Sequence, residues 1–180
     1  ISQTGGARPI EKIGGGTLEL AAANSYTGAT TVTGGVLNVT GSIASTVVNV
    51  GTGAGLQVDG ASLLNSAAVT LSGTGNLTLT GSETIGSLAS ASANSTVTLG
   101  ANTLTTGDAG NDTFAGVISG TGGLTKQGAG TFTLTNANTY GGTTTVSNGT
   151  LALSGSGAVA STTVSIGGAG TLTDDGDGLA

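Results

Sequence analysis

Four acidic residues in the body of the chain are of a type that could do acid–base chemistry: Glu19, Asp59, Glu83 and Asp108. Enzymes that cleave polysaccharides need carboxylates on one face, usually with a base or a metal. These acids are widely separated along the chain, and the only basic residue near them is Lys12. The chain has no Cys and no His, which removes thiol nucleophiles, imidazole bases and the usual zinc ligands. We therefore assign no catalytic, cofactor-binding or metal-binding residue, and expect no cofactor.

A second group of acids lies on Gly-rich segments, where oxygen ligands can bind Ca²⁺. Asp108 and Asp112 are close in sequence, and Asp174, Asp175 and Asp177 lie near the last residue. The chain lacks both the repeated nine-residue Gly/Asp calcium pattern and the EF-hand spacing. Solvated turns are the main interpretation, and a calcium-tuned module is an alternative. Asp174 also takes an inward position in the last predicted strand, so that coil is expected to fray.

Two tyrosines recur in similar surroundings, Tyr26 in Asn-Ser-Tyr-Thr-Gly and Tyr140 in Asn-Thr-Tyr-Gly-Gly. Exposed Tyr favours binding interfaces, so adhesive contacts are one interpretation. Because the two positions are equivalent in a repeat, we favour an architectural role. In that role the ring covers a corner and the hydroxyl lies at the surface. Asn24 and Asn138 are then turn residues that bond nearby backbone.

Two further pairs are interpreted as structural. Phe114 and Phe132 fall in the apolar alternation, which predicts core packing rather than ligand stacking. Lys12 and Lys126 are equivalent in the repeat, and we expect solvated residues at a coil edge rather than catalytic lysines.

Charge and composition restrict the class of protein. Nine acids outnumber Arg8, Lys12 and Lys126, giving a net charge of −6 without the basic patch that nucleic acids require. No apolar run approaches the roughly 20 residues of a membrane helix. Gly accounts for 36 residues, which suggests low complexity and disorder, but a mean hydropathy of +0.29 and sustained Leu/Val alternation argue against disorder. The chain starts at Ile1 without an initiator Met or a signal peptide, so we expect an excised fragment.

The elements that must position these residues are short and repeated. Gly130-Thr131-Phe132-Thr133-Leu134 alternates apolar and polar residues, the period of a strand with one buried face. Similar segments recur at a nearly constant interval along the whole chain, which is typical of a solenoid. Their first inward residues are expected at Leu18, Leu37, Leu56, Leu77, Val97, Phe114, Phe132, Leu151 and Leu172.

A second apolar row falls between these strands, so each coil should hold at least two. It comprises Val32, Val48, Val50, Val69, Leu71, Ile85, Leu88, Leu104, Val146, Val164 and Ile166. Stacking at about 4.8 Å would turn both rows into parallel sheets in about nine coils. Outward Thr pairs occur at 96/98, 131/133 and 171/173. A flat Thr array could bind ice, but Glu19, Asn38, Gln57 and Ala152 interrupt it.

A longer repeat is built on the short one. Residues 12–41 match residues 126–155 without a gap, at an offset close to six of the short coils. The match includes Lys12/Lys126, Asn24/Asn138 and Tyr26/Tyr140, and Ile1-Ser2 also matches Ile118-Ser119.

The most regular segment carries a family resemblance. Residues 116–134 read Gly-Val-Ile-Ser-Gly-Thr-Gly-Gly-Leu-Thr-Lys-Gln-Gly-Ala-Gly-Thr-Phe-Thr-Leu, followed by Asn138-Thr-Tyr-Gly-Gly-Thr-Thr-Thr-Val146 and Gly149-Thr-Leu151. This resembles the passenger-associated transport repeat of bacterial autotransporters. The resemblance implies a secreted passenger domain displayed on the cell surface and exported through an outer-membrane translocator barrel of the same parent chain.

We therefore expect an all-β protein, a right-handed parallel β-helix (solenoid), the hand being implied by the resemblance. The repeat interval sets its coils at about 19 residues each. Residues 1–180 should form one β-helical unit, with repeat copies near 12–60 and 116–173 and linking coils over 61–115. The expected function is a non-catalytic structural and adhesive stalk that contacts other copies or a cell-surface receptor. A polysaccharide-degrading β-helix enzyme with most of its site outside this chain is the alternative.

Overall fold

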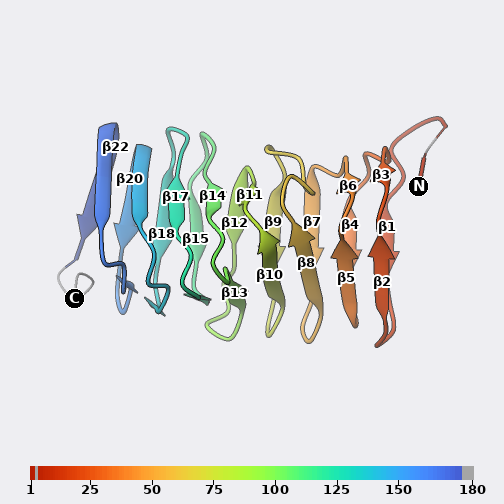
Figure 1. Ribbon diagram of the computed structural model, residues 1–180, viewed down its shortest axis with the longest axis horizontal. Coiled ribbons are helices and arrows are strands. Elements are labelled where there is room, and N and C mark those ends of the chain that lie inside the picture. The colour runs from red at the N-terminus through yellow and green to blue at the C-terminus, as the bar shows by residue number, and fades with distance from the viewer. Residues whose placement is uncertain (3, 176–180) are drawn as a thin grey trace.

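The computed structural model describes residues 1–2 and 4–175, which form a rod of stacked parallel strands. The strands follow one another in chain order from β1 to β22 along the long axis (Figure 1). Pairing is parallel throughout, and each strand pairs with strands of the preceding and following coils. None of the described residues forms a helix of the length and hydropathy needed to cross a membrane. The predicted all-β parallel solenoid is confirmed.

Each coil contributes strands to three faces. Face 1 contains β1(Ile10–Lys12), β4(Thr30–Val32), β7(Val47–Val50), β9(Ala68–Leu71), β12(Ser87–Ala89), β15(Asp112–Phe114), β18(Thr131–Leu134) and the second halves of β20(Thr144–Leu153) and β22(Val164–Asp174). Face 2 contains β2(Thr17–Leu20), β5(Val36–Val39), β8(Gly55–Asp59), β10(Asn76–Gly81), β13(Thr96–Thr98), β16(Val117–Ser119), β19(Ala137–Asn138) and β21(Ala158–Val159). Face 3 contains β3(Ala23–Asn24), β6(Ser42–Ile43), β11(Glu83–Thr84), β14(Leu104–Thr106), β17(Leu124–Lys126) and the first halves of β20 and β22.

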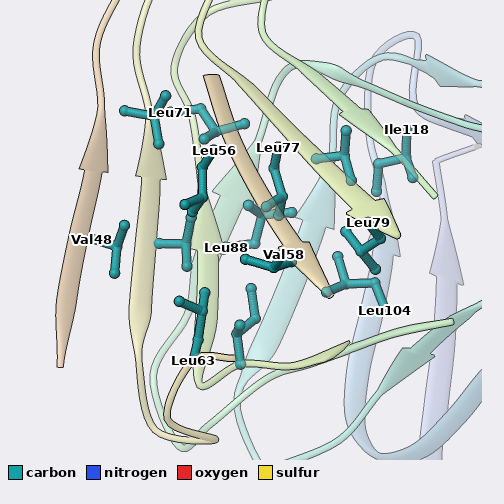
Figure 2. Close-up of a cluster of buried hydrophobic side chains, with 14 of the residues drawn as sticks. Val48, Leu56, Val58, Leu63, Leu71, Leu77, Leu79, Leu88, Leu104 and Ile118 are labelled. Atoms are coloured by element: carbon teal, nitrogen blue, oxygen red, sulfur yellow. The ribbon is translucent and has the colours of Figure 1, made fainter. Parts of the chain in front are cut away.

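The interior is a continuous column of apolar side chains. On face 2, Leu18, Leu37, Leu56, Leu77 and Val97 lie one above another in register. Leu37, Leu56, Leu77 and Val97 are completely buried, and Leu18, in the outermost coil, is only partly buried. Figure 2 shows Leu56, Leu77 and Ile118 in the same buried cluster as Val48 and Leu104, which belong to the other two faces. The alternation in each strand therefore fills one shared core.

Two details of the predicted rows are wrong. Val97 pairs with Ile118 rather than with Phe114, and Phe114 pairs with Leu134 on face 1. The predicted column changes face at this point, and so does the second row, because Leu104 and Val146 belong to face 3. Most coils hold three strands, which agrees with the predicted minimum of two, but a regular spacing along the sequence does not say which face a strand occupies.

The offset between the two copies of the long repeat also differs from the predicted six coils. Strand β17 is the repeat equivalent of β1, but β1 lies on face 1 and β17 on face 3. Likewise β18 corresponds to β2 but lies on face 1, on the ladder that begins with β1. The offset between the copies therefore spans five coils and two faces. The second copy is turned by one face of the three, while its internal pairing is kept.

The tight turns of both copies depend on glycine. Gly35 and Gly149 are repeat equivalents with φ of +64° and +65°. A Cβ on Gly35 would lie 2.2 Å from the carbonyl oxygen of Gly16, and one on Gly149 would lie 2.4 Å from that of Gly130. The left-handed backbone and the close approach of the coil below together exclude a side chain here.

Replacing Leu77 by alanine tests the shared core. Leu77 is completely buried, so Leu77→Ala should lower the free energy of unfolding by about 2–5 kcal/mol. The neighbouring outward residue provides the control, since Thr78→Ala should change stability by less than about 0.5 kcal/mol. Urea denaturation followed by circular dichroism measures both. Equal effects of the two substitutions would contradict the assigned inward face.

Candidate functional site

Lys12 and Lys126 lie inside the rod, so the prediction that they are solvated is wrong. Their side chains are 7% and 1% exposed. The Lys12 Nζ donates hydrogen bonds to the carbonyl oxygens of Ile13, Gly14 and Gly34 at 2.7–2.9 Å. The repeat preserves this arrangement, because the Lys126 Nζ donates to Gln127, Gly128 and Asn148 at 2.5–3.3 Å.

Each lysine therefore connects two coils from within. Two of its three acceptors belong to the turn that follows its own strand, and the third belongs to the next coil. Burial lowers the pKa of Lys126, while the nearby Asp108 and Asp112 carboxylates oppose that shift. Three carbonyl groups take the place of the water that the amine loses on burial.

The two tyrosines fill corners of the interior. Tyr26 is 1% exposed and Tyr140 is fully buried, so they are architectural as predicted, but their hydroxyls are not at the surface. The Tyr26 hydroxyl lies 2.8 Å from the Thr30 Oγ1, and the Tyr140 hydroxyl lies 2.7 Å from the Thr144 Oγ1. Burial raises the pKa of both phenols. An adhesive role for the rings is excluded by their position.

The paired asparagines bond nearby backbone as predicted, but they lie in the strands β3 and β19 rather than in turns, and they also make a cross-coil contact. The Asn138 amide donates to the carbonyl oxygens of Asn136 and Ala158, and its Oδ1 accepts from the Ile118 N–H at 2.9 Å. In the first copy the Asn24 amide donates to the carbonyl oxygens of Ala22 and Ser42. The terminal amine of Ile1 donates to the Asn24 Oδ1, so Ile1 takes the place that Ile118 has in the second copy.

Phe114 and Phe132 are core residues, as predicted, with 0% and 2% exposure. They lie at different inward positions of face 1, where Phe114 pairs with Leu134 and Phe132 with Leu151. Neither ring is available to a ligand.

The four acids of the body of the chain are not brought together. Glu19 is exposed on β2 and accepts a hydrogen bond from the Thr40 hydroxyl at 2.9 Å. Asp59 is exposed at the end of β8, also on face 2 but two strands away, and accepts from the Thr80 hydroxyl. Asp108 accepts from the Gly110 N–H at 2.6 Å. Glu19 and Asp59 thus each bond a threonine of the next coil, Asp108 bonds within its own turn, and these three carboxylates are not gathered around one position.

Glu83 is the exception, because it is 2% exposed inside face 3. Its Oε2 accepts the Ser62 N–H at 2.9 Å and its Oε1 accepts the Thr84 N–H at 3.2 Å. Here residues 62–63 form no strand, so the carboxylate supplies acceptors that the backbone ladder lacks. Burial raises the pKa of Glu83, and these backbone hydrogen bonds partly oppose the shift.

The structure does not gather the acids that were considered as calcium ligands into one cluster of three or more within the described residues. No group of three or more carboxylates, His or Cys gathers anywhere in residues 1–2 and 4–175. Burial raises the pKa of Asp112, as does the nearby Asp108, whereas Lys126 lowers it. Asp174 occupies the predicted inward position, above Leu153, but within an ordered strand. Asp177 lies outside the described residues.

Outward threonines form rows that only the register defines. Thr131, Thr150 and Thr171 lie side by side on face 1, whereas Ala152 interrupts the next row as predicted. A longer row on face 3 was missed by the sequence analysis. It consists of Thr84, Thr105, Thr125, Thr145 and Ser165. Its regular spacing is visible in the sequence, but single Thr residues are too common there to be recognised as a row.

The described part of the chain contains no pocket. The notable sites are instead the two equivalent internal networks of Lys, Asn and Tyr. A family model described as the passenger-associated-transport-repeat matches residues 10–39 and 124–153, the segments that hold these networks. The chain carries two passenger-associated transport repeats. No curated protein and no solved structure matches the chain.

The transport repeats and the β-solenoid fit an autotransporter passenger, a class that is secreted to the cell surface. The matched segments run from β1 to β5 and from β17 to the end of β20. In each transport repeat, most of the distinctive polar side chains point inward. The residues that distinguish the transport repeat therefore serve mainly to hold the rod together from inside.

Removing the Lys126 ammonium should destabilise the second transport repeat. Lys126→Met keeps most of the side-chain volume but leaves three carbonyl groups without their donor, at a cost of about 1–3 kcal/mol. Lys12→Met is the matched comparison and should cost less, because Lys12 is 7% exposed whereas Lys126 is 1% exposed. Urea unfolding midpoints report both values. A Lys126→Met protein as stable as the parent would contradict the structural role.

Glu83 should make stability depend on pH. Its pKa is raised above 4.5 in the folded state, so its stabilising contribution is fully present below pH 4.5 and is lost as the pH rises through the folded pKa. The stability of the parent relative to Glu83→Gln should therefore fall as the pH increases from 4.5 toward neutrality. Unfolding curves of both proteins across this range provide the measurement. Parallel pH profiles would show that Glu83 does not titrate abnormally.

Proposed function

We propose that this chain is a non-catalytic stalk of an autotransporter passenger that is displayed outside the cell. The observation that carries the proposal is the uninterrupted interior, in which inward residues of adjacent coils stack from β1 to β22. Such a rod holds a distal region away from a surface without a cleft of its own. The separated, individually bonded carboxylates support the non-catalytic part.

The stalk also assists folding during secretion. Each strand pairs only with strands of neighbouring coils, so coils can be added one at a time from one end. Lys12 and Lys126 each donate one hydrogen bond to a carbonyl group of the following coil, which holds that coil in place in each transport repeat. The partner in this process is the outer-membrane translocator barrel of the same parent chain.

The sides of the rod make adhesive contacts with a cell-surface receptor or with another copy. The row from Thr84 to Ser165, whose members are all at least partly exposed, offers five hydroxyls in register on face 3. The chain has few positive charges, which disfavours nucleic acid as a partner. The two transport repeats face different directions, so adhesion depends on the register of one face rather than on the repeat itself.

Beads coated with the purified chain test the adhesive part. Thr105→Lys, Thr125→Lys and Thr145→Lys combined should abolish binding of the beads to cultured epithelial cells, because the outward row is replaced while the core is kept. Asn38→Lys, Gln57→Lys and Thr78→Lys provide the matched control on face 2 and should retain binding. Thermal unfolding confirms that both variants remain folded.

Two results would contradict the proposal. Failure of the parent beads to bind would remove the adhesive part and leave the stalk. Turnover of a polysaccharide or ester that is lost on substitution of Glu19 or Asp59 would replace the non-catalytic assignment with an enzyme.

A further inference from the structure

The two transport repeats differ at the carbonyl group of the following coil that each buried lysine bonds. Lys12 bonds the carbonyl oxygen of Gly34 at 2.8 Å. Lys126 bonds that of Asn148 at 3.3 Å, and Asn148 is followed by Gly149. This is the only Asn-Gly dipeptide in the chain. Asparagine is among the chemically less stable residues, and a following glycine has no side chain to block attack of its backbone nitrogen on the asparagine amide.

The structure places the two reacting groups together. The Gly149 N–H donates a hydrogen bond to the Asn148 Oδ1 at 2.8 Å. The Asn148 Cγ is bonded directly to that oxygen, so the nitrogen lies beside the carbon that it would attack. The Asn148 side chain is exposed, which gives water access to the site. Coil packing also requires the glycine, because a Cβ on Gly149 would lie 2.4 Å from the carbonyl oxygen of Gly130.

Lys126 acts on the same peptide group. The Asn148 carbonyl and the Gly149 nitrogen belong to one peptide bond, and the Lys126 Nζ donates to its oxygen from inside the rod. An ammonium has three N–H donors, which matches the three carbonyl acceptors around this nitrogen. A positive group at the carbonyl oxygen stabilises the anion that forms when the peptide N–H loses its proton. It also polarises the carbonyl carbon toward attack by water.

We propose that Asn148 and Gly149 form a self-modification site in which Lys126 activates the reacting peptide group. In the first step the Gly149 nitrogen gives up its proton and forms a bond to the Asn148 Cγ. The bond between Cγ and the side-chain nitrogen breaks, and that nitrogen takes up the proton and leaves as ammonia. The product is a five-membered succinimide ring, and no oxidant or reductant is needed.

In the second step water opens the ring. Attack on the former backbone carbonyl carbon of Asn148 breaks its bond to the Gly149 nitrogen, which takes a proton from the water and stays bonded to Cγ. The product is isoaspartate, in which the main chain passes through the side chain. Attack on Cγ would give aspartate instead. Because Lys126 bonds the oxygen of the backbone carbonyl, it favours the first of these attacks, and isoaspartate is the main product.

The modification adds a negative charge beside the buried lysine. The new free carboxylate forms on the carbon whose oxygen already accepts from Lys126, so an ion pair can replace a neutral contact between two coils. The first transport repeat has Gly34 at this position and cannot react. The inference goes beyond the proposed function, because it requires neither a receptor nor a second copy and does not depend on adhesion.

Incubation of the purified chain near neutral pH tests the proposal. Labelling with an isoaspartyl methyltransferase, together with mass spectrometry of the peptides, should locate isoaspartate at residue 148. Lys126→Met should slow its formation about tenfold or more and lower the share of isoaspartate in the product. Lys12→Met removes the equivalent lysine of the first repeat and should leave the rate unchanged. Asn148→Gly restores the residue of the first repeat and should abolish the reaction.

Two controls separate activation from unfolding. In concentrated urea the parent and Lys126→Met should react at the same rate, because the lysine is no longer held against the peptide group. Circular dichroism shows whether Lys126→Met is folded without urea. Lys126→Gln keeps a polar head group but not the charge, should be slowed as well, and takes its place if the methionine variant unfolds.

Two results would overturn the proposal. The first is a folded parent that remains unmodified at Asn148 while the free peptide of residues 147–150 is converted under the same conditions. The second is an equal rate and an equal share of isoaspartate in the parent and in a folded Lys126 variant. The dipeptide would then react without help from the lysine.

Discussion

The structure depends on one constraint, which is that every inward side chain must fit between the side chains of the coils above and below. Parallel register places equivalent positions about 4.8 Å apart. A side chain that fits poorly in one coil therefore disturbs the packing of the coils on both sides. Leu, Val and Ile satisfy this constraint by packing. The largest inward polar residues satisfy it together with hydrogen-bond partners, as Lys126 does with three carbonyl groups and Tyr140 does with Thr144.

The same constraint explains how a transport repeat can be copied onto a different face. Strands on all three faces pair in register with strands of the adjacent coils, and the equivalent two-residue strands β3 and β19 each keep one buried position although they lie on different faces. The network around Lys12 is therefore reproduced around Lys126 although the second copy is turned by one face. What the two copies share is an internal arrangement, while the outward direction of their surface is free to change.

The sides of the rod and its interior consequently have different chemistry. The sides carry hydroxyl and amide groups on strands whose backbone is already paired, so contacts there must use side chains. The interior holds a large polar group such as the buried Lys126 together with its hydrogen-bond acceptors. Glu83 shows a third case. Its carboxylate accepts the backbone N–H groups of Ser62 and Thr84 at a place where residues 62–63 form no strand, and so keeps the coil closed.

The amino-acid sequence by itself determined the strand period, the coil spacing, the parallel solenoid and the equivalence of Lys12 with Lys126, because these follow from local alternation and internal repetition. It also predicted that Phe132 is core and that Asn138 bonds nearby backbone. Only the tertiary structure decided that the lysines are buried, that the tyrosine hydroxyls are internal, and that the Thr row on face 3 is continuous. Burial and lateral neighbours depend on which of three faces a strand occupies. A periodicity along the sequence does not specify which face that is.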